Sequence, residues 1–173
     1  MILPLAGCGS EPASGPRGWY FAGSKIEDKQ APGGFGPCDN FPKECDEKTP
    51  GAPGELSLIA SPDEIVEFRG RKCILLRLVN RTQKTLAFLA CDSSLFVVQE
   101  SLGIAGWTPI ESFPSSDCGN SDHRVFLEPD EYWEFYAIRR PGRLRFRLEP
   151  HWDQELNVKA GSLFSNEYDG SVD

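Results

Sequence analysis

From Glu55 onward, short hydrophobic runs alternate with turn residues, a pattern typical of β-strands. The segment 143–148 alternates most regularly, with leucine or phenylalanine at even positions and arginine at odd positions. No long segment shows the 3.6-residue period of an amphipathic helix. The pattern predicts strands at 56–60, 64–68, 73–79, 86–89, 94–99, 104–110, 124–127, 132–138 and 143–148.

Strands at this spacing predict an all-β fold, and we favour an antiparallel immunoglobulin-like β-sandwich of about eight strands over a barrel. We expect residues 55–173 to form the sandwich, preceded by an irregular N-terminal extension. The core is expected to include Val125, Leu127, Phe135 and Phe146, with Phe126 facing the other side of its strand.

The first third of the chain is rich in glycine and proline and predicts little regular structure. We expect residues 8–54 to form a flexible tether that contains a loop closed by Cys38 and Cys45. The aromatic run at 19–21 is expected to dock on the sandwich. The alternative is an exposed aromatic patch that stacks on a sugar or a partner.

Charge and cysteine content narrow the class of protein. The 173-residue chain has a net charge of −8, which disfavours nucleic-acid binding. No apolar stretch in the sequence is long enough for a transmembrane helix. Six cysteines in a chain of this size favour an oxidising, extracytoplasmic compartment.

The N-terminal sequence Leu5-Ala6-Gly7-Cys8 resembles the lipobox of bacterial lipoproteins. The resemblance implies that residues 1–7 are the end of a signal peptide. It also implies lipid attachment to Cys8 and anchoring to the cell membrane or outer membrane. Only seven residues precede Cys8 and none is basic, so we expect the true start to lie upstream or the sequence to be trimmed. A chance match in the N-terminus is the open alternative.

If Cys8 carries lipid, five cysteines remain. We predict disulfides between Cys38 and Cys45 and between Cys91 and Cys118, and a buried free thiol at Cys73. The alternative is a metal or thiol site formed by Cys91, Asp92, Cys118, Asp122 and His123. Because the chain has no Cys-x-x-Cys pair and only two histidines, we predict neither a metal nor a cofactor.

Three segments between 63 and 148 are similar to small immunoglobulin-like modules of exported bacterial proteins: Leu76-x-Leu78-x-Asn80-x-Thr82, residues 107–111 and Leu127-x-Pro129. The resemblance implies a module that binds or builds and does not catalyse. Proteinase-inhibitor modules share this architecture, but no segment marks an inhibitory loop. No nucleophile elbow or phosphate loop is present, so we predict that the chain is not an enzyme. The motifs at 115–121 and 165–170 are distinctive, and the sequence assigns no role to them.

One group of cations stands out in this acidic chain and is the predicted partner-binding site: Arg139, Arg140, Arg143, Arg145 and Arg147. The alternative is a solvated face paired with acids such as Glu131 and Glu134. If the group binds an anionic partner, charge reversal at Arg145 is expected to weaken capture without lowering stability.

The predicted function is therefore a membrane-anchored extracytoplasmic binding or structural lipoprotein with a protein partner, such as an accessory subunit of a cell-envelope complex. A small secreted metal protein or enzyme that uses Cys118 and His123, and a protease-inhibitor-like module, remain as alternatives.

Overall fold

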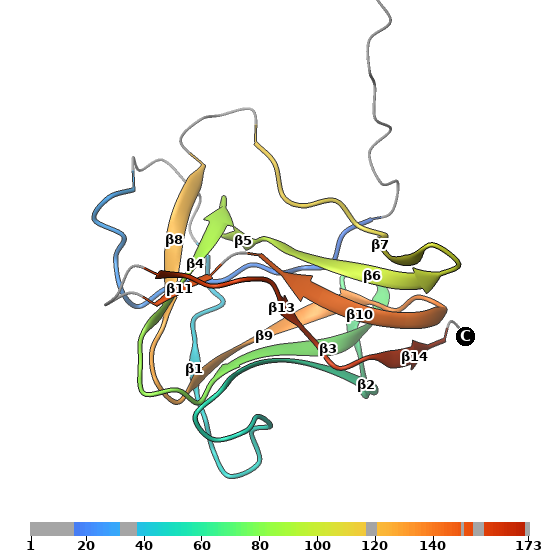
Figure 1. Ribbon diagram of the computed structural model, residues 1–173, viewed down its shortest axis with the longest axis horizontal. Coiled ribbons are helices and arrows are strands. Elements are labelled where there is room, and N and C mark those ends of the chain that lie inside the picture. Colours follow the sequence, from blue (N-terminus) through green and yellow to red (C-terminus); the bar gives the residue numbers. More distant parts are fainter. Residues whose placement is uncertain (1–15, 32–37, 117–120, 150, 154–157, 172–173) are drawn as a thin grey trace, which may run out of the picture.

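The computed structural model describes residues 16–31, 38–116, 121–149, 151–153 and 158–171 (Figure 1). All strand pairs in these ranges are antiparallel, and the ranges contain no helix, so none that could span a membrane. The predicted all-β antiparallel class is confirmed, whereas the immunoglobulin-like topology stays a prediction.

The described ranges contain fourteen strands, of which eight are four residues or longer. They are β1 Lys43–Glu44, β2 Leu56–Phe68, β3 Arg71–Asn80, β4 Leu86–Cys91, β5 Ser94–Leu95, β6 Val97–Gly103, β7 Gly106–Pro109, β8 Asp122–Leu127, β9 Glu131–Ile138, β10 Gly142–Leu148, β11 His151–Asp153, β12 Val158–Lys159, β13 Leu163–Phe164 and β14 Tyr168–Gly170.

The strands form three sheets. Sheet A has the order β1-β9-β3-β2. Sheet B has the order β12-β11-β4-β5, with β8 also paired to β4. Sheet C has the order β13-β10-β6-β7, with β14 also paired to β10. In Figure 1, β6 and β10 lie above β2, β3 and β9, so sheets A and C form two layers of a sandwich.

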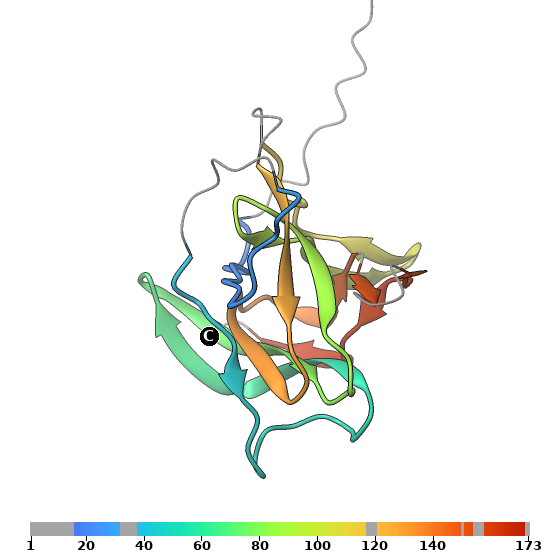
Figure 2. The same ribbon diagram turned by 90° about the vertical axis from the view of Figure 1, so that its left-hand side faces the viewer.

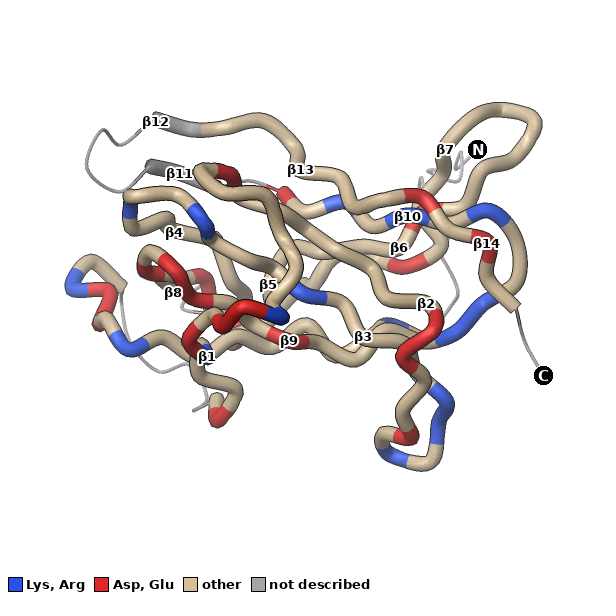
Figure 3. The backbone as a smooth tube through the Cα atoms, turned by 90° about the horizontal axis from the view of Figure 1, so that it is seen from below, with Lys and Arg blue, Asp and Glu red and all other residues tan. Residues whose placement is uncertain are grey.

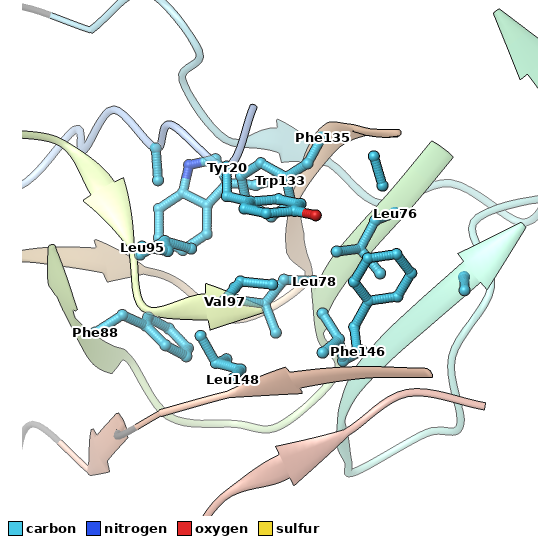
Figure 4. Packing of buried hydrophobic residues seen from close by; sticks show 14 of the residues in the cluster. Tyr20, Leu76, Leu78, Phe88, Leu95, Val97, Trp133, Phe135, Phe146 and Leu148 are labelled. Atoms are coloured by element: carbon cyan, nitrogen blue, oxygen red, sulfur yellow. The ribbon is translucent and has the colours of Figure 1, made fainter. Parts of the chain in front are cut away.

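The core fills the space between these layers (Figure 4). Trp133 is fully buried; its indole ring packs edge-on against Phe88, and its N–H donates to the carbonyl of Gly23 at 2.9 Å. The four predicted core residues are all buried. Phe126 is buried as well. The 22–28 segment runs along the free edge of β8 (Figure 2), where the hydroxyl of Ser24 accepts a hydrogen bond from the backbone amide of Phe126 and Asp28 accepts one from that of Arg124.

The N-terminal segment is part of the sandwich and not a tether over residues 17–24. Trp19 pairs with Tyr136 of sheet A, and Phe21 pairs with Ser94 of sheet B. Between them, Tyr20 is fully buried and packs edge-on against one phenylalanine from sheet A and one from sheet C. The expected docking of the aromatic run is therefore present, and the domain begins well before the predicted boundary at 55.

The expected Cys38–Cys45 bridge is not formed, and both thiols are free. The side-chain amide of Asn40 donates to the carbonyl of Glu134, and the backbone N–H of Cys45 donates to the carbonyl of Asp130. The segment thus runs along β9 from Glu134 to Asp130. Residues four apart on a strand are separated by roughly 13 Å, beyond the ~7 Å Cα separation that a disulfide allows.

The other cysteines divide between described and undescribed residues. Cys73 is buried with a free thiol, as predicted. Cys91 is also a buried free thiol, and its predicted partner Cys118 lies outside the described residues, as does Cys8.

The 165–170 motif joins the two layers. The Asn166 amide exchanges two hydrogen bonds with the backbone of Ala60 on β2, at 2.8 and 3.0 Å. Tyr168 stacks on Phe146 in the core, and its hydroxyl accepts a hydrogen bond from Gln99. A Cβ at Gly170 would lie 2.0 Å from the carbonyl oxygen of Arg140, so no side chain fits there. The motif therefore has a structural role.

Candidate binding surface

The outer face of sheet C gathers the odd-numbered arginines of β10 with aromatic and acidic side chains. The register places Leu102 opposite Trp107, Glu100 opposite Arg145 and Arg147 opposite Phe164. Directly opposed residues in an antiparallel pair share one face of the sheet. We call this surface the arginine–aromatic face: Glu100, Leu102, Trp107, Arg143, Arg145, Arg147 and Phe164.

Arg145 is held at the centre of this face. Its guanidinium lies 4.3 Å from the ring centre of Trp107 and 4.2 Å from that of Phe164. Its Nε donates to Glu100 at 2.8 Å, and the Glu100 side chain is only 5% exposed. Cation–π contacts and an ion pair therefore fix the arginine in one orientation.

The neighbouring arginines are also paired. Arg147 lies 2.8 Å from Glu100 and 2.8 Å from Glu149. Arg143 lies 2.9 Å from Glu167. The arginines of β10 are therefore ion-paired, as the alternative interpretation expected, but their partners are not Glu131 and Glu134. Glu131 and Glu134 lie on β9 in sheet A and pair with Lys25, Lys43 and Arg77.

Arg145 therefore contributes to the stability of the fold as well as to the charge of the surface. Reversing its charge would place a second carboxylate against the nearly buried Glu100. The expectation that this change leaves stability unaffected is therefore not supported by the geometry.

Apolar side chains remain exposed around the paired arginines. Leu102 is 45% exposed and Phe164 44% exposed. Ile104, in the two-residue turn between β6 and β7, is fully exposed. Residues 101–110 contain no charged side chain in a chain of which a quarter is charged. Trp, Arg and Phe next to exposed aliphatic groups are the composition of protein-binding sites.

Arg139 and Arg140 belong elsewhere. They lie in the connection between β9 and β10, where Arg139 donates to Ser171 and Arg140 donates to the carbonyl of Pro16. The five predicted arginines therefore form two separate groups and not one stripe.

A buried carboxylate that sequence reasoning missed anchors the N-terminal segment. Glu111 accepts hydrogen bonds from the amides of Gly18 and Gln99 and from the Tyr20 hydroxyl, at 2.9, 3.0 and 2.9 Å. Burial raises the pKa of Glu111 and of Tyr20. No local pattern marks Glu111, because its partners come from distant parts of the chain.

The alternative metal or thiol site is not assembled by the described residues. Cys91 faces Asp122 across β4 and β8, whereas His123 faces Ala90. Adjacent residues of a strand point to opposite faces, so Cys91 and His123 diverge. Burial raises the pKa of the Cys91 thiol, which keeps it protonated and unreactive. In the described part of the chain, no three His, Cys, Asp or Glu side chains could hold a metal ion.

A cavity of about 450 Å³ lies between the 22–28 segment, residues 38–41 and β8. Three of its charged side chains are already used in ion pairs, Arg124 with Asp28 at 2.8 Å and Lys25 with Glu131. His123 borders it but is buried, with Nδ1 3.1 Å from the carbonyl of Ser121. The cavity is therefore a weaker binding candidate than the arginine–aromatic face.

Comparisons of this chain with models of protein families, with curated proteins and with solved structures found no match.

Proposed function

We propose that this chain is a membrane-anchored extracytoplasmic binding protein. In this proposal Cys8 carries the lipid, and the arginine–aromatic face captures a protein of the cell envelope. The observation that carries the proposal is the exposure of Leu102, Ile104 and Phe164 around an arginine that is already held in place.

Preorganisation supports binding at this face. An arginine that is free in solution loses side-chain entropy when a partner fixes it, which costs roughly 0.5–1.5 kcal/mol. Arg145 has already lost that freedom to Trp107, Phe164 and Glu100. A partner that packs on the face therefore gains contacts without this ordering penalty.

The charge balance of the face favours an apolar or mixed partner over a polyanion. Arg143 and Arg145 each lie within 3 Å of a carboxylate, and Arg147 lies close to two. An anionic ligand would therefore have to compete with these carboxylates. We accordingly assign recognition to the exposed apolar groups, with the ion pairs setting the shape of the surface.

The anchor is tested by metabolic labelling with a palmitate analogue. The chain is expressed from its natural upstream reading frame in a bacterial host. We expect label and membrane association in the natural protein and neither in Cys8→Ser. An unlabelled natural protein would refute the anchor.

The binding face is tested by capture of partners from solubilised envelope fractions. Ile104→Asp is compared with Ile65→Asp, because Ile65 is 50% exposed on β2 of sheet A and does not belong to the arginine–aromatic face. We expect Ile104→Asp to lose the captured protein and Ile65→Asp to retain it. Equal capture by both variants would exclude this face.

A further inference from the structure

Two turns bring five cations together at one side of the molecule. The β2–β3 turn carries Arg69, Arg71 and Lys72, all exposed. The β9–β10 connection lies next to it, because the amide of Arg139 donates to the carbonyl of Lys72 at 3.4 Å. We call this group the basic end: Arg69, Arg71, Lys72, Arg139 and Arg140. Figure 3 shows basic segments in both turns on one side of the molecule.

The backbone of the β2–β3 turn indicates that the cation at its tip is not incidental. Phe68 pairs with Arg71, so Arg69 and Gly70 form a two-residue turn. Both have positive φ angles, 50° and 71°. Such turns favour Asn, Asp or Gly at the first position, and an arginine there is strained. Arg69 occupies a position for which its backbone preference is poor.

The basic end keeps a local positive charge within an acidic protein. Three described carboxylates offset it in part: Glu67 lies opposite Lys72 in the β2–β3 ladder, Glu111 lies 3.8 Å from Arg140, and Asp169 lines a small cavity together with Arg139 and Arg140. Charges farther away are screened over about 8 Å at physiological salt. The five cations of the basic end therefore outnumber the described carboxylates beside them.

The N-terminal segment enters the fold beside the basic end. Arg140 binds the carbonyl of Pro16, and the Trp19 ring packs against Phe68, the residue before the β2–β3 turn. Trp19 pairs antiparallel with β9, so residues 16–18 run toward the β9–β10 connection. Cys8 is eight residues before Pro16. Eight residues reach at most about 29 Å, so a lipid on Cys8 would hold the basic end close to the bilayer.

We propose that the basic end is a docking surface for anionic lipid headgroups, which orients the tethered domain on its membrane. This inference rests on the proposed anchor at Cys8. Weak electrostatic contacts suffice, because the tether keeps the local lipid concentration high and each basic residue near an anionic surface adds to binding.

The test separates the docking surface from the anchor. The full chain with Cys8→Ser and an N-terminal hexahistidine tag is attached to vesicles that contain a nickel-chelating lipid. Vesicles of phosphatidylcholine alone are compared with vesicles in which phosphatidylglycerol forms a third of the lipid. Sedimentation measures the apparent affinity at low and high salt. Circular dichroism checks the fold of each variant.

We expect phosphatidylglycerol to raise the affinity, and high salt to abolish the gain. Arg69→Gly is expected to lower the affinity about fivefold, and Arg71→Glu with Lys72→Glu at least about 25-fold. Lys29→Glu with Lys48→Glu changes the net charge equally at exposed positions away from the basic end and is expected to have little effect.

Equal binding to both vesicle types, or equal loss in the two double variants, would overturn the proposal. The proposal would also be overturned if charge reversal at the basic end abolished capture of an envelope protein but left vesicle binding unchanged. Because the nickel tether replaces the acyl chains, an unlabelled Cys8 in the palmitate experiment refutes the anchor and leaves the vesicle result standing.

Discussion

The two hairpin turns β2–β3 and β6–β7 differ in every surface property although both are two-residue turns. The first presents Arg69 in a left-handed conformation, and the second presents a fully exposed Ile104 in an uncharged segment. The left-handed conformation of Arg69 costs stability, and the exposure of Ile104 lowers solubility. We therefore propose separate contacts for the two turns, an electrostatic one at β2–β3 and an apolar one at β6–β7.

The largest expected effect comes from comparing Arg145, which is ion-paired to a nearly buried carboxylate, with Arg71, which is exposed at a turn. Arg145→Glu should lower the free energy of unfolding by about 3 kcal/mol, since it breaks a nearly buried ion pair and leaves Glu100 beside a like charge. Arg71→Glu, at an exposed turn, should change it by less than about 0.5 kcal/mol. Urea unfolding measures both. Similar losses in the two variants would remove the distinction.

A cross-over experiment tests whether the two turns have separate partners. Leu102→Asp with Ile104→Asp should reduce capture of the envelope partner at least about tenfold and leave vesicle affinity unchanged. Arg71→Glu with Lys72→Glu should do the reverse. If either double variant impairs both assays while remaining folded, the two turns serve one contact.

Substitution in the strained β2–β3 turn is expected to have a smaller effect on stability, and to change stability and vesicle affinity in opposite directions. Arg69→Gly should raise the free energy of unfolding by about 0.5 kcal/mol, because relief of the left-handed strain exceeds the entropy cost of glycine. Vesicle affinity should fall in the same variant. A loss of stability would show that the Arg69 side chain supports the fold, for example through its contact with the Phe68 ring.

The smallest effect concerns the ion pair between Arg77 and Glu64 on sheet A, which is more exposed than the pair between Arg145 and Glu100. Arg77 holds the pKa of Glu64 at about 2, below its usual 4.5. Because the pKa is lowered by folding, the pair stabilises the fold above pH 4.5, and this contribution is lost as the pH falls toward 2. Glu64 is 48% exposed, so the contribution should be below about 0.5 kcal/mol.

Glu64→Gln should therefore remove part of the acid-induced loss of stability. Urea unfolding at pH 6 and pH 2.5 measures the difference for natural protein and variant. An unchanged pH dependence would show that the exposed pair contributes nothing measurable.

Most strand positions could be predicted because a two-residue period is a local property. The segment around Pro62 shows the limit of that signal. Two strands were expected at 56–60 and 64–68, but β2 continues through both, with a register shift between Ser61 and Ile65. β2 is an edge strand of sheet A, so Pro62 interrupts no ladder on its outer side.

The candidate site was predicted only in part. The alternation at 143–148 placed three arginines on one face, which the structure bears out. Their partners could not be predicted, since Glu100 and Phe164 reach Arg145 only through the pairing of β10 with β6 and β13. The disulfide expected at 38–45 failed for a similar reason: proximity in sequence says nothing of separation in space when the segment runs extended along β9.

The sequence by itself determined the all-β class, the positions of most strands, the buried apolar residues and the acidic character of the chain. These depend on side-chain type and short-range period, which the chain carries locally. Only the tertiary structure decided that Tyr20 belongs to the core, that Glu111 is buried and that five arginines divide into two surfaces. These features depend on which strands lie side by side, and that choice is made by long-range packing.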